Sequence, residues 1–286
     1  MKSWLLYFLA FAAAIGAVPA VGGLYGEDER SVLISVKRSD GVIESVGIEE
    51  FVAAVICSEY GEVNEPEAAK ALAVAVRSAA LYVDLHGCRH GDCDFCDSPD
   101  CCFLFLPLES YPAETARFAV EAAKSTEGGI ITYRGEPAMA LITLCSGTGT
   151  RTCCEYPYIT GVKRETECEK HKTVKTFTVA ELEKAFGGAK EESDVCIVSG
   201  ENGYCEFMVV DGRMIGGGEA AEMLGLTSAN FTADRDGDGN VVFVCRGAGS
   251  GYGLDLCEAE ALARAGSGYK SIIGRAFPES EICENY

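Results

Sequence analysis

Basic residues are scarce in this sequence, and histidine is rarer still. The 286 residues include 24 Lys and Arg against 44 Asp and Glu, a formal net charge of −20, and only three His. Binding to nucleic acid needs clustered Lys and Arg side chains that displace counterions from the phosphate backbone. No basic stripe occurs along the chain, so we expect no nucleic-acid partner.

Internal repeats and low-complexity linkers are also absent, whereas cysteine is abundant. The chain has 15 Cys, and 48% of its residues are hydrophobic against 24% charged. This composition is typical of a globular protein with a sizeable core. So many thiols indicate either an oxidising compartment, in which they pair as disulfides, or metal ligation.

Charged side chains are missing from residues 4–25 near the N-terminus. As a helix with a rise of 1.5 Å per residue this run spans about 33 Å, enough to cross a bilayer. A cleaved signal peptide is the competing interpretation, because residues 17–20 include the small side chains that cleavage requires. The run is longer than an ordinary signal-peptide core. We therefore expect a transmembrane anchor over residues 1–25 of a single-pass cell-membrane protein, with residues 26–286 on the extracytoplasmic side.

Residues 26–286 are predicted to form one α+β domain, in which buried helices pack on antiparallel strands. Apolar residues at three- and four-residue spacing predict a helix over residues 48–60. The next helix, over residues 68–85, is Ala-rich and nearly all apolar, so it is expected to be buried, with Asn64 as its N-cap. The other expected elements are a hairpin over 31–46, helices over 113–126, 179–186 and 256–264, and strands over 129–133, 138–144 and on both sides of 200–203.

Glu59 stands out among the acidic residues. It follows Ile56 and Val52 by three and seven positions, which places it on the apolar face at the end of the first helix. Partial desolvation there would raise its pKa and keep the carboxyl protonated, as a general acid requires. The alternative is an ordinary acid near solvent at the helix end.

Five short stretches of the chain occur in a distinctive order. They are FVAAVICSEY with EAAKALAVAVRS (51–60 and 67–78), SGTGT (146–150), PYITGV (157–162), LGLTS (224–228) and GAGSGYGLDLCEA (247–259). In this combination the chain resembles the stage II sporulation protein D family, which is related to amidase enhancers. The resemblance covers residues 46–282.

The resemblance implies a membrane-anchored lytic transglycosylase that cuts peptidoglycan glycan strands between N-acetylmuramic acid and N-acetylglucosamine, forming a 1,6-anhydro ring. It further implies septal cell-wall remodelling and engulfment during sporulation, with a cell-wall amidase and other septal sporulation proteins as partners. The family's His and Gln in the last stretch are Ser250 and Leu256 here. A non-catalytic wall-binding or amidase-enhancing homologue is therefore the alternative.

The resemblance makes Glu59 the catalytic acid. Because the sugar's own C6 hydroxyl closes the anhydro ring, one carboxyl can serve first as acid and then as base. Tyr158 is a second catalytic candidate, since an aromatic hydroxyl can both stack on a sugar and bond to it, although a core tyrosine would look the same.

Substrate contact is expected near three residues of the matched stretches. Ser146 and Gly147 would shape the cleft, and Ser250 would line it in the Gly-rich loop. A Cys145 nucleophile is a disfavoured alternative, because His171 is the only histidine outside the cysteine-rich segment and nothing marks it as a base.

Cysteine and histidine crowd together over residues 86–102, at a density typical of tetrahedral Zn²⁺ sites. Some members of the family carry a His-x5-Cys-x4-His-Cys zinc site after the catalytic helices. The resemblance assigns this structural site to His90, Cys96, Cys101 and Cys102, with Cys101 in place of the second histidine. Disulfides among the same residues remain the rival interpretation. The other twelve cysteines permit six disulfides, of which Cys196–Cys205 across a turn is the best local pair.

Overall fold

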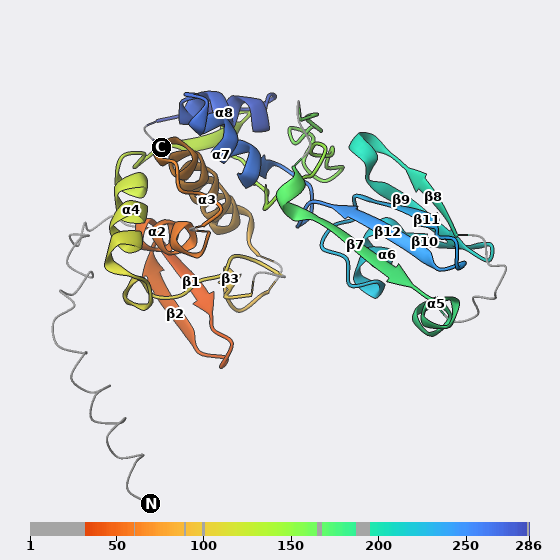
Figure 1. Cartoon of the computed structure of the whole chain (residues 1–286). Coiled ribbons are helices and arrows are strands. Elements are labelled where there is room, and N and C mark those ends of the chain that lie inside the picture. The colour runs from red at the N-terminus through yellow and green to blue at the C-terminus, as the bar shows by residue number, and fades with distance from the viewer. Residues whose placement is uncertain are drawn as a thin grey trace, which may run out of the picture.

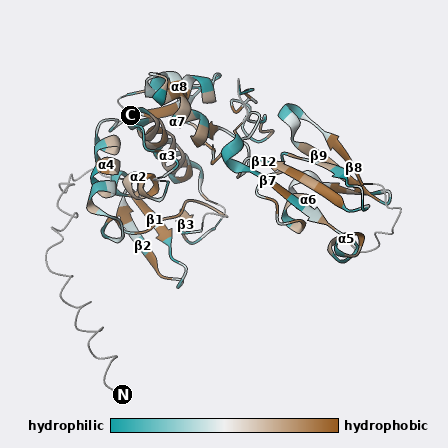
Figure 2. Cartoon of the chain, viewed as in Figure 1, coloured by the Kyte–Doolittle hydropathy of each residue, from teal (hydrophilic) through white to brown (hydrophobic). Residues whose placement is uncertain are grey.

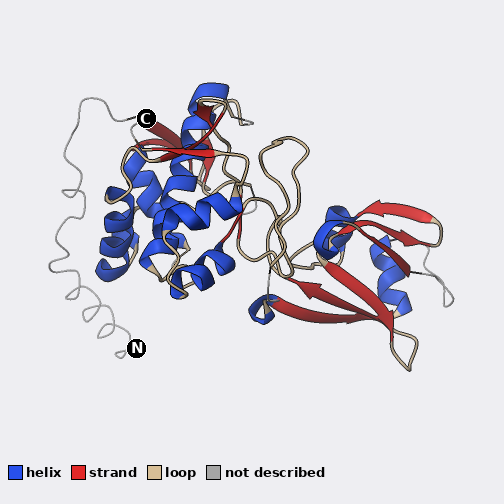
Figure 3. Cartoon of the chain, turned by 90° about the horizontal axis from the view of Figure 1, so that it is seen from above, coloured by secondary structure: helices blue, strands red, loops and turns tan. Residues whose placement is uncertain are grey.

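The computed structural model describes residues 32–59, 61–88, 90–98, 101–164, 168–186, 195–284 and 286. Over these residues the chain forms an α+β structure with two hydrophobic cores. Figure 1 shows a lobe dominated by helices and a lobe dominated by strands, and the view from above in Figure 3 shows the same separation. Long loops join the two lobes. The predicted boundary at residue 26, before one large domain, stays a prediction.

The helical lobe is centred on two consecutive helices, α2 (Ile48–Ser58) and α3 (Pro66–His86). Every residue of α2 from 51 to 57 is buried, because apolar side chains cover all faces of this helix. The Ala-rich α3 is buried along most of its length, since small side chains let neighbouring helices approach closely. The helices around this pair are α4 (Ala113–Lys124), α7 (Leu256–Arg264) and α8 (Tyr269–Ala276).

Short sheets complete the helical lobe. Strand β1 (Leu33–Lys37) pairs antiparallel with β2 (Ile43–Gly47) and parallel with β3 (Phe95–Cys96). The other strands of this lobe are β4 (Ile130–Tyr133) between β5 (Glu136–Pro137) and β14 (Glu281–Cys283), and β6 (Ile142–Thr143) parallel to β13 (Leu254–Asp255). The parallel pairs depart from the predicted all-antiparallel arrangement.

The strand lobe consists of two three-stranded antiparallel sheets. One has β12 (Val241–Arg246) between β11 (Phe231–Arg235) and β7 (Lys172–Phe177), and the other has β9 (Cys205–Val210) between β8 (Val195–Ser199) and β10 (Arg213–Gly216). Helices α5 (Val179–Phe186) and α6 (Gly217–Met223) cover them. In Figure 2 the hydrophobic colour marks β12, whose residues alternate between buried and half-buried along the strand.

Arg77 of α3 connects three parts of the helical lobe through one buried guanidinium. Its Nε and Nη2 donate to the two carboxylate oxygens of Glu49 on α2, at 2.6 and 2.7 Å. The remaining N–H groups donate to the carbonyls of Ala123, Thr126 and Gly129 at the end of α4. A planar fork of donors is suited to such a set of acceptors, and a lysine could not replace it.

The helices predicted over 48–60, 68–85, 113–126, 179–186 and 256–264 are confirmed, with differences of a few residues at their ends. The predicted Asn64 cap is wrong. Helix α3 begins at Pro66, and the N–H groups of Asn64 and Glu65 both donate to the Glu260 carboxylate of α7 at 2.9 Å. A distant carboxylate therefore takes the capping role that a local side chain was expected to fill.

The expected Cys196–Cys205 disulfide is not formed. The ladder between β8 and β9 pairs Cys196 with Val209 and Ser199 with Cys205, so the two cysteines do not face each other. Cys196 is exposed whereas Cys205 is buried, and both are free thiols.

The predicted membrane helix needs correction. Among the residues that the structure describes, no helix has the length and apolar character needed to cross a bilayer. The expected anchor, residues 1–25, lies outside the described residues. The predictions of an N-terminal membrane helix and of a single-pass membrane location are therefore not supported.

Replacing Arg77 by Ala is expected to destabilise the protein by about 3–5 kcal/mol, because Glu49 and three carbonyls would be left buried without their donor. Lys270→Ala is the control: the Lys270–Glu284 pair is more than half exposed, so its loss is expected to leave the stability nearly unchanged. Urea unfolding measures both. Equal losses for the two variants would contradict a central role for Arg77.

Candidate functional site

Glu59 lies at the C-terminal end of α2, where it is the C-cap residue. Its backbone N–H donates to the Val55 carbonyl, and its own carbonyl accepts from the N–H groups of Glu62 and Val63. The apolar helix α2 lies in the core, and Glu59, directly after its last residue, is partly buried. The sequence-based placement of Glu59 at the end of a buried helix is thus what the structure has.

Burial raises the pKa of the Glu59 carboxyl above its ordinary value of 4.5, and the nearby charge of Glu62 raises it further. The negative end of the α2 dipole acts in the same direction, because it disfavours an anion at a helix C-terminus. All three effects favour the protonated carboxyl. Glu59 therefore has the shifted pKa that a general acid requires.

Glu62, one turn further along the chain, has the opposite character. Burial alone would raise its pKa, but hydrogen bonds from Lys170 and His171 outweigh this effect and lower it below 4.5. The Lys170 Nζ lies 2.5 Å, and the His171 Nε2 3.4 Å, from the same Glu62 oxygen. Two neighbouring carboxyls whose pKa values are pushed apart are typical of acid–base sites.

Tyr111 also lies near Glu59, and sequence reasoning missed it. Its hydroxyl is buried and has no hydrogen-bond partner among the described residues. Burial, with smaller contributions from Cys57 and Glu59, raises the pKa of Tyr111 to about 12. No sequence pattern distinguishes this tyrosine, which simply precedes α4.

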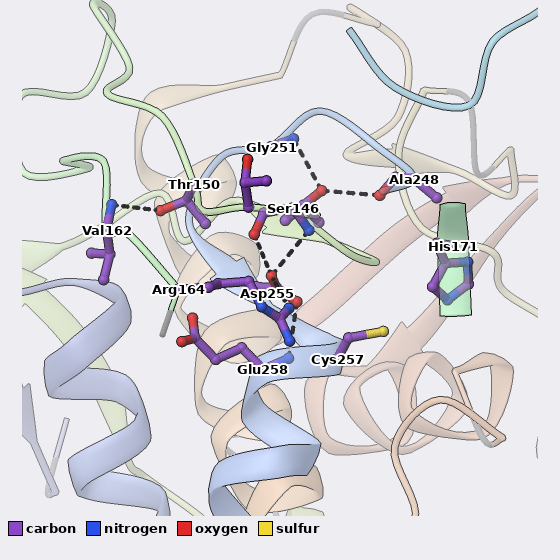
Figure 4. Close-up of polar contacts among 12 residues, drawn as sticks. Ser146, Thr150, Val162, Arg164, His171, Ala248, Gly251, Asp255, Cys257 and Glu258 are labelled. Carbon is purple, nitrogen blue, oxygen red and sulfur yellow. Dashed lines mark hydrogen bonds and ion pairs between the residues drawn. The ribbon is translucent and has the colours of Figure 1, made fainter. Parts of the chain in front are cut away.

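Ser146 lies in the loop after β6 and is completely buried. Its hydroxyl and its N–H both donate to one oxygen of Asp255, at 2.5 and 3.0 Å, and Arg164 donates to that oxygen at 2.8 Å. Figure 4 shows Ser146 and Arg164 meeting at Asp255, which also caps α7 through the Glu258 N–H. The Ser146 hydroxyl thus points into the protein, where it ties the loop to α7.

Gly147 follows with a positive φ of 73°. A Cβ at this position would lie 2.9 Å from the Cβ of Arg246. The close approach of these two segments of the chain therefore requires glycine. Gly147 therefore shapes its loop through backbone approach. Contact of Ser146 or Gly147 with a substrate stays a prediction.

Tyr158 is buried in the core of the helical lobe. Its hydroxyl accepts a hydrogen bond from the Met139 N–H at 2.8 Å, and its ring lies 4.7 Å from that of Tyr133. None of the contacts described for Tyr158 reaches Glu59. These contacts are those of a core tyrosine, and its catalytic role stays a prediction.

Ser250 is exposed in the Gly-rich loop between β12 and β13. Its carbonyl accepts from Arg151 Nε at 3.0 Å, and the Arg151 guanidinium lies over the rings of Tyr204 and Tyr252. This loop thus offers an exposed hydroxyl beside aromatic rings. It is held to the Ser146 loop by a β-bridge between Cys145 and Ala248.

A shallow pocket lies between α7, α8 and the segment around Thr150. Asp255, Glu258 and Arg275 provide its charged lining. Glu59 does not belong to it, so this pocket does not mark the candidate acid.

His90, Cys96, Cys101 and Cys102 come together, with their four ligand atoms all within 4.8 Å of one another. His90 Nε2 lies 3.0 Å from Cys102 Sγ and 3.7 Å from Cys101 Sγ, and the two sulfurs are 3.9 Å apart. Tetrahedral Zn²⁺ with Zn–S bonds of about 2.3 Å requires sulfurs about 3.8 Å apart. One imidazole and three thiols in this arrangement fit such an ion.

The structure does not assemble the alternative site in which Cys145 would be a nucleophile. Cys145 is fully buried beside Cys168 and Cys257, and His171 is bonded to Glu62. The described cysteines are all free thiols, so the disulfides that were the rival interpretation do not occur among them.

Comparison with known proteins gives two findings. Residues 37–133 match the family model described as SpoIID, stage II sporulation protein, and this segment contains Glu59 and the His90 cluster. The chain is 28% identical to stage II sporulation protein D of Bacillus subtilis (strain 168), over 95% of this chain and 84% of the relative. It is 26% identical to stage II sporulation protein D of Bacillus amyloliquefaciens, over 90% and 80% of the two chains. The resemblance to this family is confirmed.

Substituting Gln for Glu59 is expected to stabilise the protein at neutral and alkaline pH. The folded-state pKa of Glu59 is raised above its unfolded value, so ionisation costs the wild type stability as pH rises through that folded pKa. The advantage of the variant is therefore small below the ordinary pKa of 4.5 and grows as the pH rises above it through the folded-state pKa. Urea unfolding at several pH values measures it, with the exposed Glu183→Gln as control. A pH-independent difference would contradict the buried-acid description.

Proposed function

We propose that this chain is a peptidoglycan lytic transglycosylase with a role in the cell wall during sporulation, because residues 37–133 match the stage II sporulation protein model and both relatives are stage II sporulation protein D. The bond cleaved lies between N-acetylmuramic acid and N-acetylglucosamine. The observation that carries this proposal is the partly buried carboxyl of Glu59 at the end of a buried helix, where burial raises its pKa. Septal remodelling and engulfment would be the setting.

Glu59 acts twice in this mechanism. It first donates its proton to the glycosidic oxygen, which leaves as the hydroxyl of N-acetylglucosamine while positive charge develops on the muramic acid ring. The resulting Glu59 carboxylate then takes the proton of the muramic acid C6 hydroxyl, whose oxygen bonds to C1 and closes the anhydro ring. The proton count balances, no water is consumed, and Glu59 ends protonated. One carboxyl therefore suffices, whereas glycoside hydrolases use two.

Glu62 supports this cycle without touching the substrate. Its charge, held by Lys170 and His171, raises the pKa of Glu59 and so favours return of the proton to that carboxyl. Glu62 is a positioning residue in this description.

We further propose that His90, Cys96, Cys101 and Cys102 hold one structural Zn²⁺. Support comes from the convergence of the four ligand atoms. The described residues of this segment, 90–98 and 101–102, also contain little regular structure beyond the two-residue β3. A bound ion would supply the cross-links that such a loop lacks.

Substituting Gln for Glu59 is expected to lower glycan cleavage by about 10²–10⁴-fold, the usual contribution of a general acid–base residue. Peptide-stripped glycan strands are incubated with the full chain, and 1,6-anhydro ends are quantified by mass spectrometry. Glu50→Gln is the matched control: Glu50 lies on the same helix and burial also raises its pKa, but it sits at the opposite end. No anhydro products from the wild type would favour the non-catalytic wall-binding or amidase-enhancing alternative.

Zinc analysis tests the metal proposal. Protein purified without chelators is expected to lose one equivalent of Zn²⁺ when Cys96 and Cys102 are both changed to Ser, because two of four ligands are gone. Cys196→Ser, which removes an exposed thiol of the strand lobe, serves as control and should keep the wild-type zinc content. An unchanged zinc content in the double variant would overturn the assignment.

A further inference from the structure

A second group of potential metal ligands lies where the two lobes meet. The sulfurs of Cys145, Cys168 and Cys257 all lie within 4.8 Å of one another. The three residues come from separate segments: the start of the loop after β6, the turn before β7, and the first turn of α7. His171 belongs to the same turn as Cys168, and it forms a further group with Cys257 and Glu62.

We propose that Cys145, Cys168 and Cys257 bind a second tetrahedral Zn²⁺ ion, with His171 as the fourth ligand. The set is rich in soft sulfur and contains one imidazole, a ligand combination that favours zinc over the hard cations calcium and magnesium. Cys168 and His171 have Cys-x2-His spacing, which lets one short turn supply two ligands. This assignment does not depend on the proposed glycan cleavage.

Three thiols suit a metal better than a disulfide, because a disulfide would use two of them and leave one buried thiol. Backbone donors already face the sulfurs. The Gly147 N–H donates to Cys145, and the N–H groups of Lys170 and His171 donate to Cys168. Hydrogen bonds of this kind orient thiolate ligands and delocalise their charge.

The charge around the cluster is consistent with a bound ion. Three thiolates and one Zn²⁺ leave one negative charge, and two cations lie close enough to interact with it. Arg164 is buried and interacts with Cys145, and Lys170 interacts with Cys168 and Cys257. Asp255 and Glu62 are the acids nearby, and each is already paired, with Arg164 and with Lys170 respectively.

His171 lies beside one of the three sulfurs, that of Cys257, and reaches the other two only if its imidazole turns away from Glu62. Its Nε2 lies 3.4 Å from a Glu62 oxygen, and the same oxygen accepts from Cys257 Sγ at 3.7 Å. Glu62 keeps the Lys170 ammonium at 2.5 Å as a partner when the imidazole turns to the metal. Figure 4 shows His171 on the same side of the site as Cys257, away from Arg164.

An ion here would join the parts of the molecule that carry the candidate acid. Cys145 is bridged to Ala248 of the Gly-rich loop, Cys257 belongs to α7, and His171 leads directly into β7 of the strand lobe. Glu62, one turn after Glu59, contacts both His171 and Cys257. The site would therefore fix the strand lobe relative to the end of α2.

Metal stoichiometry tests the proposal on the full chain purified without chelators. We expect two Zn²⁺ per chain in the wild type, one after Cys145→Ser with Cys257→Ser, and one after Cys96→Ser with Cys102→Ser. His171→Ala retains the three thiols and is expected to bind the second ion at least tenfold more weakly in a chelator competition. Wild-type zinc content in the Cys145/Cys257 double variant would overturn the proposal.

Cobalt spectroscopy covers the case in which the double variant fails to fold. The Cys96/Cys102 variant, whose second cluster is intact, is stripped of zinc with a chelator under reducing conditions, freed of the chelator and titrated with Co²⁺ alone. A tetrahedral thiolate spectrum that saturates at one equivalent and disappears on addition of Zn²⁺ is expected. Absence of that spectrum, or a mass showing that two of Cys145, Cys168 and Cys257 are joined as a disulfide in the purified protein, would contradict the second site.

Discussion

The buried guanidinium of Arg77 is the interaction on which the helical lobe depends. It joins α2 through Glu49, and the end of α4 through three carbonyls, to the central helix α3. These contacts set the rotation and depth of α2, since its other buried residues are apolar and exert no directional force. The position of Glu59 at the end of α2 follows from that constraint, and so does the partial burial that makes it an acid.

Two carboxyls three residues apart, just beyond the end of α2, then acquire different chemistry from their surroundings. Glu59 meets the core and the negative end of a helix, whereas Glu62 meets Lys170 and His171. The partners of Glu62 belong to the segment that enters the strand lobe, so the strand lobe contributes to the electrostatics of the candidate site. The cysteines at the same junction extend this connection to the Gly-rich loop.

Local patterns predicted the helices and the position of Glu59, because a buried helix repeats its apolar residues at a fixed spacing. Strand β7 escaped prediction: five of its six residues are exposed, so neither face carries an apolar pattern. Helix α8 was not predicted either, because it buries only Ile272 and Ile273, too few residues to show the helical spacing of apolar side chains. The His90 cluster was predicted because its ligands are close in sequence. Sequence reasoning did not predict the second cluster, because only the fold brings Cys145, Cys168 and Cys257 together.

The central claim of the proposed mechanism is that one carboxyl, that of Glu59, serves as both acid and base. Cleavage of glycan strands by the full chain in water enriched in ¹⁸O tests this directly. If the Glu59 carboxylate takes the proton of the C6 hydroxyl, water takes no part in the reaction. The products are then 1,6-anhydromuramic acid ends that contain no ¹⁸O. Reducing muramic acid ends that each carry one ¹⁸O would show attack by water, and would contradict the proposed role of Glu59.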